Sequence, residues 1–113
     1  MLPAIRRLRK EKDFERIFKK GKGFKEDFLA LKTVGSSLKV SRFGFIVSQK
    51  VSKKATVRNK IRRRLSELIR TWLGKIIPGR EVLFIVLPGF EKKDFRETEE
   101  LLDKLLKKAN LIR

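Results

Sequence analysis

The sequence predicts an α/β (α+β) two-layer sandwich, in which helices pack on one mixed β-sheet. Two observations support this fold class. Segments with apolar residues three and four positions apart, typical of helices, are interspersed with segments of alternating or continuous apolar residues, typical of strands. Residues 81–87, EVLFIVL, are almost wholly apolar, as expected of a central strand covered on both faces. The predicted order is α-β-β-α-β-α, or α-β-β-β-α-β-α if a bend splits one strand, in a single domain spanning residues 1–113.

Residues 11–20, EKDFERIFKK, predict the first helix, after a basic and irregular arm over residues 1–10. Acidic residues begin this helix and lysines end it, which suits the helix dipole, and Gly21 follows as a stop. Phe14 and Phe18 lie one turn apart and belong to a single apolar stripe.

Residues 24–34 and 38–48 predict two strands. A Gly-Ser-Ser turn at 35–37 joins them, so we expect the two strands to pair antiparallel. One face of the second strand is apolar and is formed by Phe43, Phe45 and Val47. The other face, which includes Gly44 and Ile46, is expected to be only partly covered.

Residues 56–73 carry the strongest helix pattern, with Thr56 as the expected N-cap and Gly74 after its end. Its apolar stripe consists of Val57, Ile61, Leu65, Leu68 and Trp72. A final helix is predicted over 94–109, with Asp94 as its cap. Its expected apolar face consists of Phe95, Leu101, Leu102, Leu105 and Leu106.

The charge distribution predicts a polyanionic partner. The formal net charge is +18, and no acidic residue occurs between Asp27 and Glu67. So many like charges repel one another unless a polyanion neutralises them, and nucleic acid is the first candidate, ahead of an anionic membrane surface. Because the cations follow a strand and continue onto a helix, we expect shaped recognition and not a disordered basic tail.

Protein-borne catalysis is not expected. The chain has no His and no Cys, which removes the usual general base and thiolate chemistry, and no protein metal site is predicted. The acidic group at 97–103 has the spacing of a solvated helix face. No apolar run approaches the length of a membrane span and no signal peptide is evident, so a cytoplasmic location is expected. Phe14 and Phe18 have two readings: ordinary core packing or an exposed platform on which bases stack.

Three segments resemble the protein subunit of bacterial ribonuclease P. They are GFIVSQKV at 44–51, KKA at 53–55 and RNKIRR at 58–63, and the DFxxIFKxG pattern at 13–21 is similar to the first helix of that family. The resemblance extends over essentially the whole chain. Gln49 stands where a lysine is common, and Lys60 stands where an arginine is commoner.

The resemblance implies a ribonucleoprotein in which the RNA subunit is the catalyst. That RNA uses Mg²⁺ to hydrolyse the phosphodiester that releases the 5′ leader of precursor tRNA. It implies that the protein binds this RNA through Lys50, Lys53, Lys54, Arg58, Asn59, Lys60, Arg62 and Arg63. It also implies a cleft between the first helix and the sheet for the single-stranded leader, formed by Phe14, Phe18, Leu31 and Ile46. The family's β-α-β crossover is left-handed, against the general preference.

Two other functions share some of these features. A ribosomal or other structural RNA-binding protein would carry similar charge but would not need an aromatic helix beside a cleft. A membrane-active cationic protein would need an exposed apolar face opposite the charge.

Overall fold

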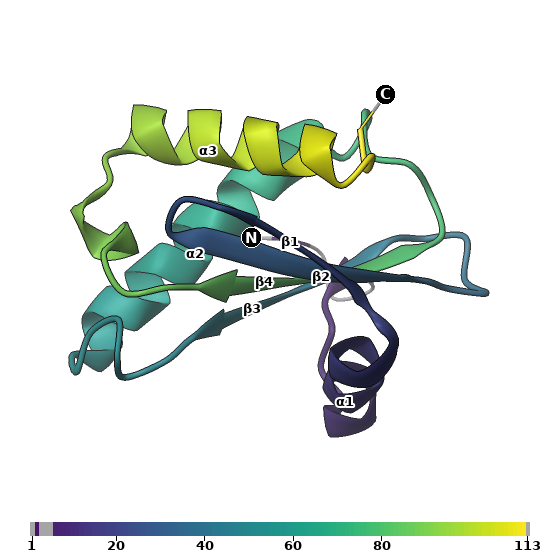
Figure 1. Cartoon of the computed structure of the whole chain (residues 1–113), viewed down its shortest axis with the longest axis horizontal. Coiled ribbons are helices and arrows are strands. Elements are labelled where there is room, and N and C mark those ends of the chain that lie inside the picture. Colours follow the sequence, from purple (N-terminus) through teal and green to yellow (C-terminus); the bar gives the residue numbers. More distant parts are fainter. Residues whose placement is uncertain (1, 3–5, 113) are drawn as a thin grey trace.

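The computed structural model describes residues 2 and 6–112. One mixed four-stranded sheet has α1 on one face and α2 and α3 on the other, as Figure 1 shows, so the predicted fold class is confirmed. The helices are α1 (Glu11–Lys20), α2 (Ala55–Trp72) and α3 (Phe95–Lys108), with the short 3₁₀ helix η2 (Phe90–Lys92) before α3. The strands are β1 (Lys22–Glu26), β2 (Leu29–Gly35), β3 (Arg42–Val47) and β4 (Arg80–Val86).

The strand order, β1-β2-β4-β3, corrects one predicted pairing. The single strand expected over 24–34 is a hairpin, β1 and β2, because Asp27 turns the chain with a φ of 53°. The segment 38–48 does not pair with its predecessor: β3 pairs parallel with β4, and β4 pairs antiparallel with β2. The most apolar strand takes the central place because two neighbours and two covered faces remove it from water.

The main core lies between the sheet and the helices α2 and α3. The crossover from β3 through α2 to β4 places the predicted stripe of α2 there, with Leu65 and Ile69 fully buried. From the sheet side, Phe84 is also fully buried and its ring stacks on Phe45 with centroids 5.5 Å apart. The smaller core on the opposite face lies under α1 and is centred on Leu8, Ile17 and Leu83.

The helix ends confirm one predicted cap and correct two other expectations. Asp94 caps α3, because its carboxylate accepts the backbone N–H of Glu97 at 2.8 Å within a capping box. Thr56 is not the cap of α2, which begins at Ala55 after Lys54 and has no side-chain cap. Phe95 is not part of the apolar face of α3: at the first position of the helix it lies beyond the core, and 55% of its surface is exposed.

The predicted N-terminal arm is described in part, since residues 1 and 3–5 lie outside the described residues. Leu2 and Leu8 are buried, and the backbone N–H of Leu8 donates to the carbonyl of Phe43 at 2.8 Å. The described part of the arm therefore packs along β3 and covers part of that edge. None of the described helices combines the length and apolarity needed to cross a lipid bilayer.

A lysine ties the β1–β2 turn to the start of α3. The Lys93 ammonium lies 3.0 Å from the Asp27 carboxylate and 3.8 Å from that of Glu97, and 5.2 Å from the centre of the Phe28 ring. The hydrogen bond to Asp27 raises the pKa of Lys93 above its ordinary value. The stabilising contribution of this pair is therefore present at neutral pH and is lost as the pH rises through the range where lysine titrates.

Candidate nucleic-acid interface

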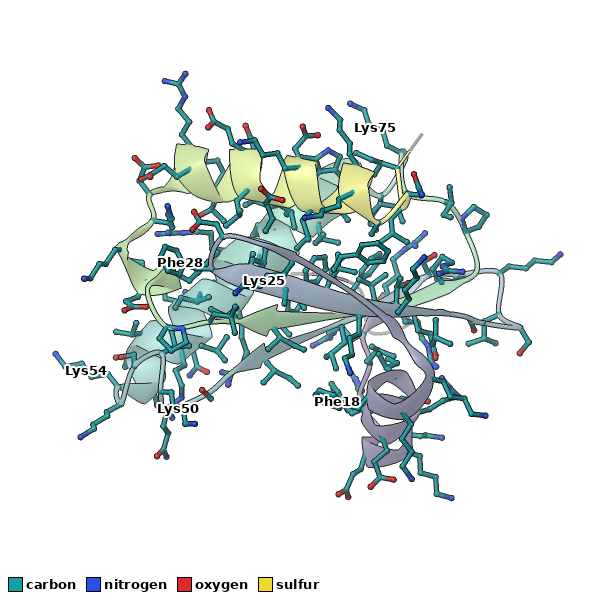
Figure 2. All side chains as sticks on the ribbon, in the orientation of Figure 1. Phe18, Lys25, Phe28, Lys50, Lys54 and Lys75 are labelled. Atoms are coloured by element: carbon teal, nitrogen blue, oxygen red, sulfur yellow. The ribbon has the colours of Figure 1, made fainter. Side chains whose placement is uncertain are left out.

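The loop between β3 and α2 presents a group of free cations. Figure 2 shows Lys50 and Lys54 projecting from it at the start of α2, at the opposite end of the molecule from Lys75. Five of the predicted RNA-binding side chains are exposed and have no hydrogen bond or ion pair within the described chain: Lys50, Lys53, Lys54, Lys60 and Arg63. Unpaired, solvated ammonium and guanidinium groups at this density favour a phosphate backbone.

Two arginines at the start of α2 also hold this loop in place. Arg58 Nη1 donates to the carbonyl of Ser52 at 2.9 Å. Arg62 Nη1 donates to Oδ1 of Asn59 at 2.6 Å, and its Nη2 lies 3.5 Å from the carbonyl oxygen of Val47 at the end of β3. Since a guanidinium carries five N–H donors, both side chains keep donors for an external oxygen. All eight predicted RNA-binding residues therefore lie together on the loop and the first half of α2.

The two aromatic residues of α1 have different environments. Phe14 is half-buried in the smaller core, where its Cε1 would lie only 3.0 Å from a Cβ added at Gly44. Phe18 is 45% exposed, and Lys32 lies over its ring, with Nζ 5.3 Å from the centroid. The same ammonium donates to the Phe18 carbonyl at 3.0 Å. Phe18 therefore has the exposure that a stacking platform needs, and Phe14 anchors the helix beside it.

The sheet residues predicted for the leader cleft are separated by the structure. Ile46 is half-buried on the α1 face, in the same cluster as Phe14. Leu31 does not line a cleft: it is fully buried in the main core on the opposite face. Side chains alternate along a strand, so Lys32, next to Leu31, points toward α1 instead. Sequence reasoning missed Lys32, although the alternation of apolar and polar residues along β2 marks it.

A groove of about 180 Å³ connects α1 with the cationic helix along the edge strand β3. Phe14 lines it from α1, Gly44 from β3, and Arg62 and Ser66 from α2. Arg7 of the N-terminal arm also lines the groove, and its Nε is buried without a hydrogen-bond partner in the described part of the molecule. An aromatic ring and a guanidinium thus share one groove, which suits an extended single strand of nucleic acid. The sequence gives no signal for Arg7 or Ser66.

A buried ion-pair cluster fixes α1 on the sheet. The Glu81 carboxylate in β4, of which 1% is exposed, accepts hydrogen bonds from Arg16 of α1 and from Arg42 of β3. Asp13 of α1 joins the cluster, 3.3 Å from Arg16 and 3.5 Å from Arg42. In the described part of the chain, no three His, Cys, Asp or Glu side chains are grouped so as to hold a metal ion.

Comparison with known proteins gives one consistent family. A family model described as Ribonuclease P matches residues 2–110. The ribonuclease P protein component of Synechocystis sp. is 37% identical over 112 residues, which cover 98% of this chain and 90% of the relative. That of Alkaliphilus metalliredigens is 32% identical and covers 94% and 95% of the two chains.

Two solved structures match over nearly the whole fold. The ribonuclease P protein from Thermotoga maritima superposes with a TM-score of 0.82 at 33% identity, over 90% of this chain and 96% of that one. The Staphylococcus aureus protein superposes with a TM-score of 0.89 at 26% identity, over 96% and 98%.

Proposed function

This chain belongs to the ribonuclease P protein family, the protein components of a tRNA-processing ribonuclease, and we propose that it binds a catalytic RNA subunit and the 5′ leader of precursor tRNA at the same time. The observation that carries this proposal is a groove lined by both an α1 ring and an α2 guanidinium, Phe14 and Arg62. One surface of the chain can thereby hold two stretches of RNA side by side.

The RNA subunit binds to the 48–54 loop and the exposed face of α2. Its phosphates are neutralised by the free lysines of the loop, and the partly braced Arg58 and Arg62 provide oriented guanidinium donors. A guanidinium that is already held by the protein loses less freedom on binding a phosphate than a free side chain does. Asn59 orients Arg62 through the 2.6 Å hydrogen bond, which is its proposed role.

The single-stranded leader binds along the α1 face of the sheet. Phe18 and Phe14 offer aromatic surface to its bases, Lys32 provides a cation beside Phe18, and Ile46 forms part of the apolar floor. Unpaired bases stack on such rings whatever their sequence, which suits leaders of varied sequence.

The catalytic Mg²⁺ ions are proposed to be held by the RNA subunit, which carries out the hydrolysis. Two carboxylates in the cluster that fixes α1 on the sheet, Asp13 and Glu81, are engaged by Arg16 and Arg42. The protein contributes charge neutralisation and leader positioning, which let the RNA cleave at lower Mg²⁺ concentration. A cytoplasmic location is part of the same proposal, because tRNA precursors of bacteria are made there.

The test is cleavage of 5′-labelled precursor tRNA by a bacterial ribonuclease P RNA at an Mg²⁺ concentration where the RNA alone is slow. Addition of the protein should accelerate release of the leader, and the protein without RNA should release none. Replacing Lys50, Lys53 and Lys54 by Ala should remove the acceleration. The charge-matched control replaces Lys75, Lys104 and Lys107, and should retain it. Cleavage by the protein alone, or equal loss in both triple variants, would contradict the proposal.

A further inference from the structure

Phe95 is the most exposed large apolar side chain among the described residues, with 55% of its surface accessible. The capping box formed by Asp94 and Glu97 fixes the backbone on both sides of Phe95. A single exposed apolar side chain is common on protein surfaces, so the side chains around this ring decide whether it can bind a partner.

The surroundings of Phe95 are cationic. The ring borders a surface groove of about 300 Å³ whose other walls are α2 side chains: Lys60, Arg63, Arg64 and Glu67. These four are spaced i, i+3, i+4 and i+7 and therefore share one face of the helix. Arg64 Nη1 donates to the carbonyl of Lys93 at 3.2 Å, which ties α2 to the segment that carries Phe95. The ring and the cations thus keep a defined relation to each other.

Three cations and one carboxylate around an exposed ring fit an unpaired nucleotide, whose base offers a π-face and whose phosphates carry the complementary charge. An apolar peptide would leave the cations without partners. We propose that Phe95, with Lys60, Arg63 and Arg64, forms a second RNA contact, in which the ring stacks on an unpaired base of the RNA subunit. This inference rests on the proposed function and adds Phe95 and Arg64 to its interface.

The fold favours the RNA subunit over the leader as the occupant. The groove is formed by α2 and α3, which cover the face of the sheet opposite α1, as Figure 1 shows. The leader is proposed to lie on the α1 face. Lys60 and Arg63 also belong to the surface assigned to the RNA subunit, so the groove continues that surface toward α3.

The experiment measures the affinity of the full chain for a bacterial ribonuclease P RNA subunit, without precursor tRNA, at several salt concentrations. Phe95→Ala should weaken binding by between about 5-fold and 150-fold, the range of one lost stacking contact. The slope of log affinity against log salt should not change, because no phosphate contact is lost. Phe95→Trp should retain the affinity, and Phe95→Leu should behave like Phe95→Ala.

The matched control is Leu38→Ala, which removes an apolar side chain of similar exposure, 49%, from a distant loop and should leave the affinity unchanged. Melting temperatures of all variants should equal that of the unaltered protein, since neither side chain is in the core. Unchanged affinity of Phe95→Ala overturns the inference. So does a loss confined to precursor tRNA binding by the assembled holoenzyme, or a loss of self-association in place of RNA binding.

The two proposals fail in different ways. If the unaltered protein binds the RNA subunit and the triple lysine variant does not, the proposed function stands, and the Phe95 variants then decide this inference alone. If the unaltered protein does not bind the RNA subunit, the proposed function fails, and this inference fails with it.

Discussion

The arginines of α2 differ in what they do within the protein, and this difference can separate folding from binding. Arg58 donates to the Ser52 carbonyl, so it contributes to the order of the loop as well as to its charge. Arg63 is exposed and has no such bond among the described residues. If substitution of Arg63 lowers RNA affinity, the loss therefore reports the missing RNA contact and not a change in the structure of the loop.

We predict that Arg63→Ala lowers RNA-subunit affinity by about 1–3 kcal/mol and reduces the salt slope by about one, with no change in melting temperature. Arg58→Ala should lower affinity similarly and also cost about 0.5–1.5 kcal/mol of stability, for its lost hydrogen bond. Filter binding against salt and thermal melting measure both. Arg70→Ala, at the other end of α2, is the control; an equal effect there would mean that only total charge matters.

For Phe18, we predict that Phe18→Ala weakens binding of precursor tRNA to the holoenzyme by about 1–3 kcal/mol and leaves mature tRNA nearly unaffected. Because the ring is 45% exposed, stability should fall far less than the roughly 3–5 kcal/mol expected for the fully buried Phe84→Ala. The measurement is the ratio of precursor to mature tRNA affinity. A large loss of stability with an unchanged ratio would assign Phe18 to packing alone.

At the scale of elements, the position of α1 is set by a glycine and an ion-pair cluster. Gly44 lets Phe14 approach the sheet, since an added Cβ would lie 3.0 Å from the Phe14 ring and 3.2 Å from Leu83. Glu81 then holds α1 through Arg16. The spacing between α1 and the sheet, where the leader is proposed to bind, depends on both features.

We predict that Gly44→Ala costs about 1–3 kcal/mol of stability, because the new methyl group overpacks the smaller core and displaces the Phe14 ring. The ratio of precursor to mature tRNA affinity should fall with it. Gly23→Ala is the matched control: its nearest neighbour would be 3.9 Å away, so neither stability nor the ratio should fall. Equal melting temperatures for the two variants would contradict the packing argument.

The second element-scale prediction concerns Glu81. Glu81→Gln should destabilise the protein by about 3 kcal/mol, because the buried carboxylate that Arg16 and Arg42 share becomes a neutral amide, and their longer contacts to Asp13 replace it only in part. Amide hydrogen exchange in α1 should accelerate more than in α2. Glu100→Gln removes an exposed pair with Arg96, 3.4 Å apart, and should cost at most about 1 kcal/mol. Equal losses in the two variants would show that burial of the pair contributes nothing.

At the scale of the whole molecule, the net charge of +18 opposes compactness in the free protein. Raising NaCl from about 50 mM to about 500 mM shortens the screening length severalfold. The melting temperature of the free protein should therefore rise with salt while its affinity for the RNA subunit falls. Thermal melting and binding titrations in the same buffers test these opposite signs; a melting temperature that falls with salt would mean that attractive ion pairs outweigh the repulsion.

The sequence by itself determined the local elements and the chemistry of the surface. The i, i+4 stripe of α2, the Asp94 cap of α3 and the apolar run of β4 depend on neighbouring residues, so periodicity and capping rules predict them. The run of cations from Lys50 to Arg64 is likewise visible in the sequence without knowledge of the fold. The family signature adds the roles of these residues, and the left-handed crossover that it implies stays a prediction.

The tertiary structure decided which strands pair and which side chains share a face. β4 inserts between β2 and β3 because burial of its apolar residues requires neighbours on both sides, and a local turn at 35–37 cannot reveal that competition. The prediction that Leu31 lines the cleft was wrong for a related reason. Neighbouring residues of a strand lie on opposite faces of the sheet, so a shift of one residue exchanges the two faces. Local sequence patterns do not contain contacts between segments far apart in the chain. Such contacts bring Arg7 and Ser66 into one groove and place Phe95 beside α2.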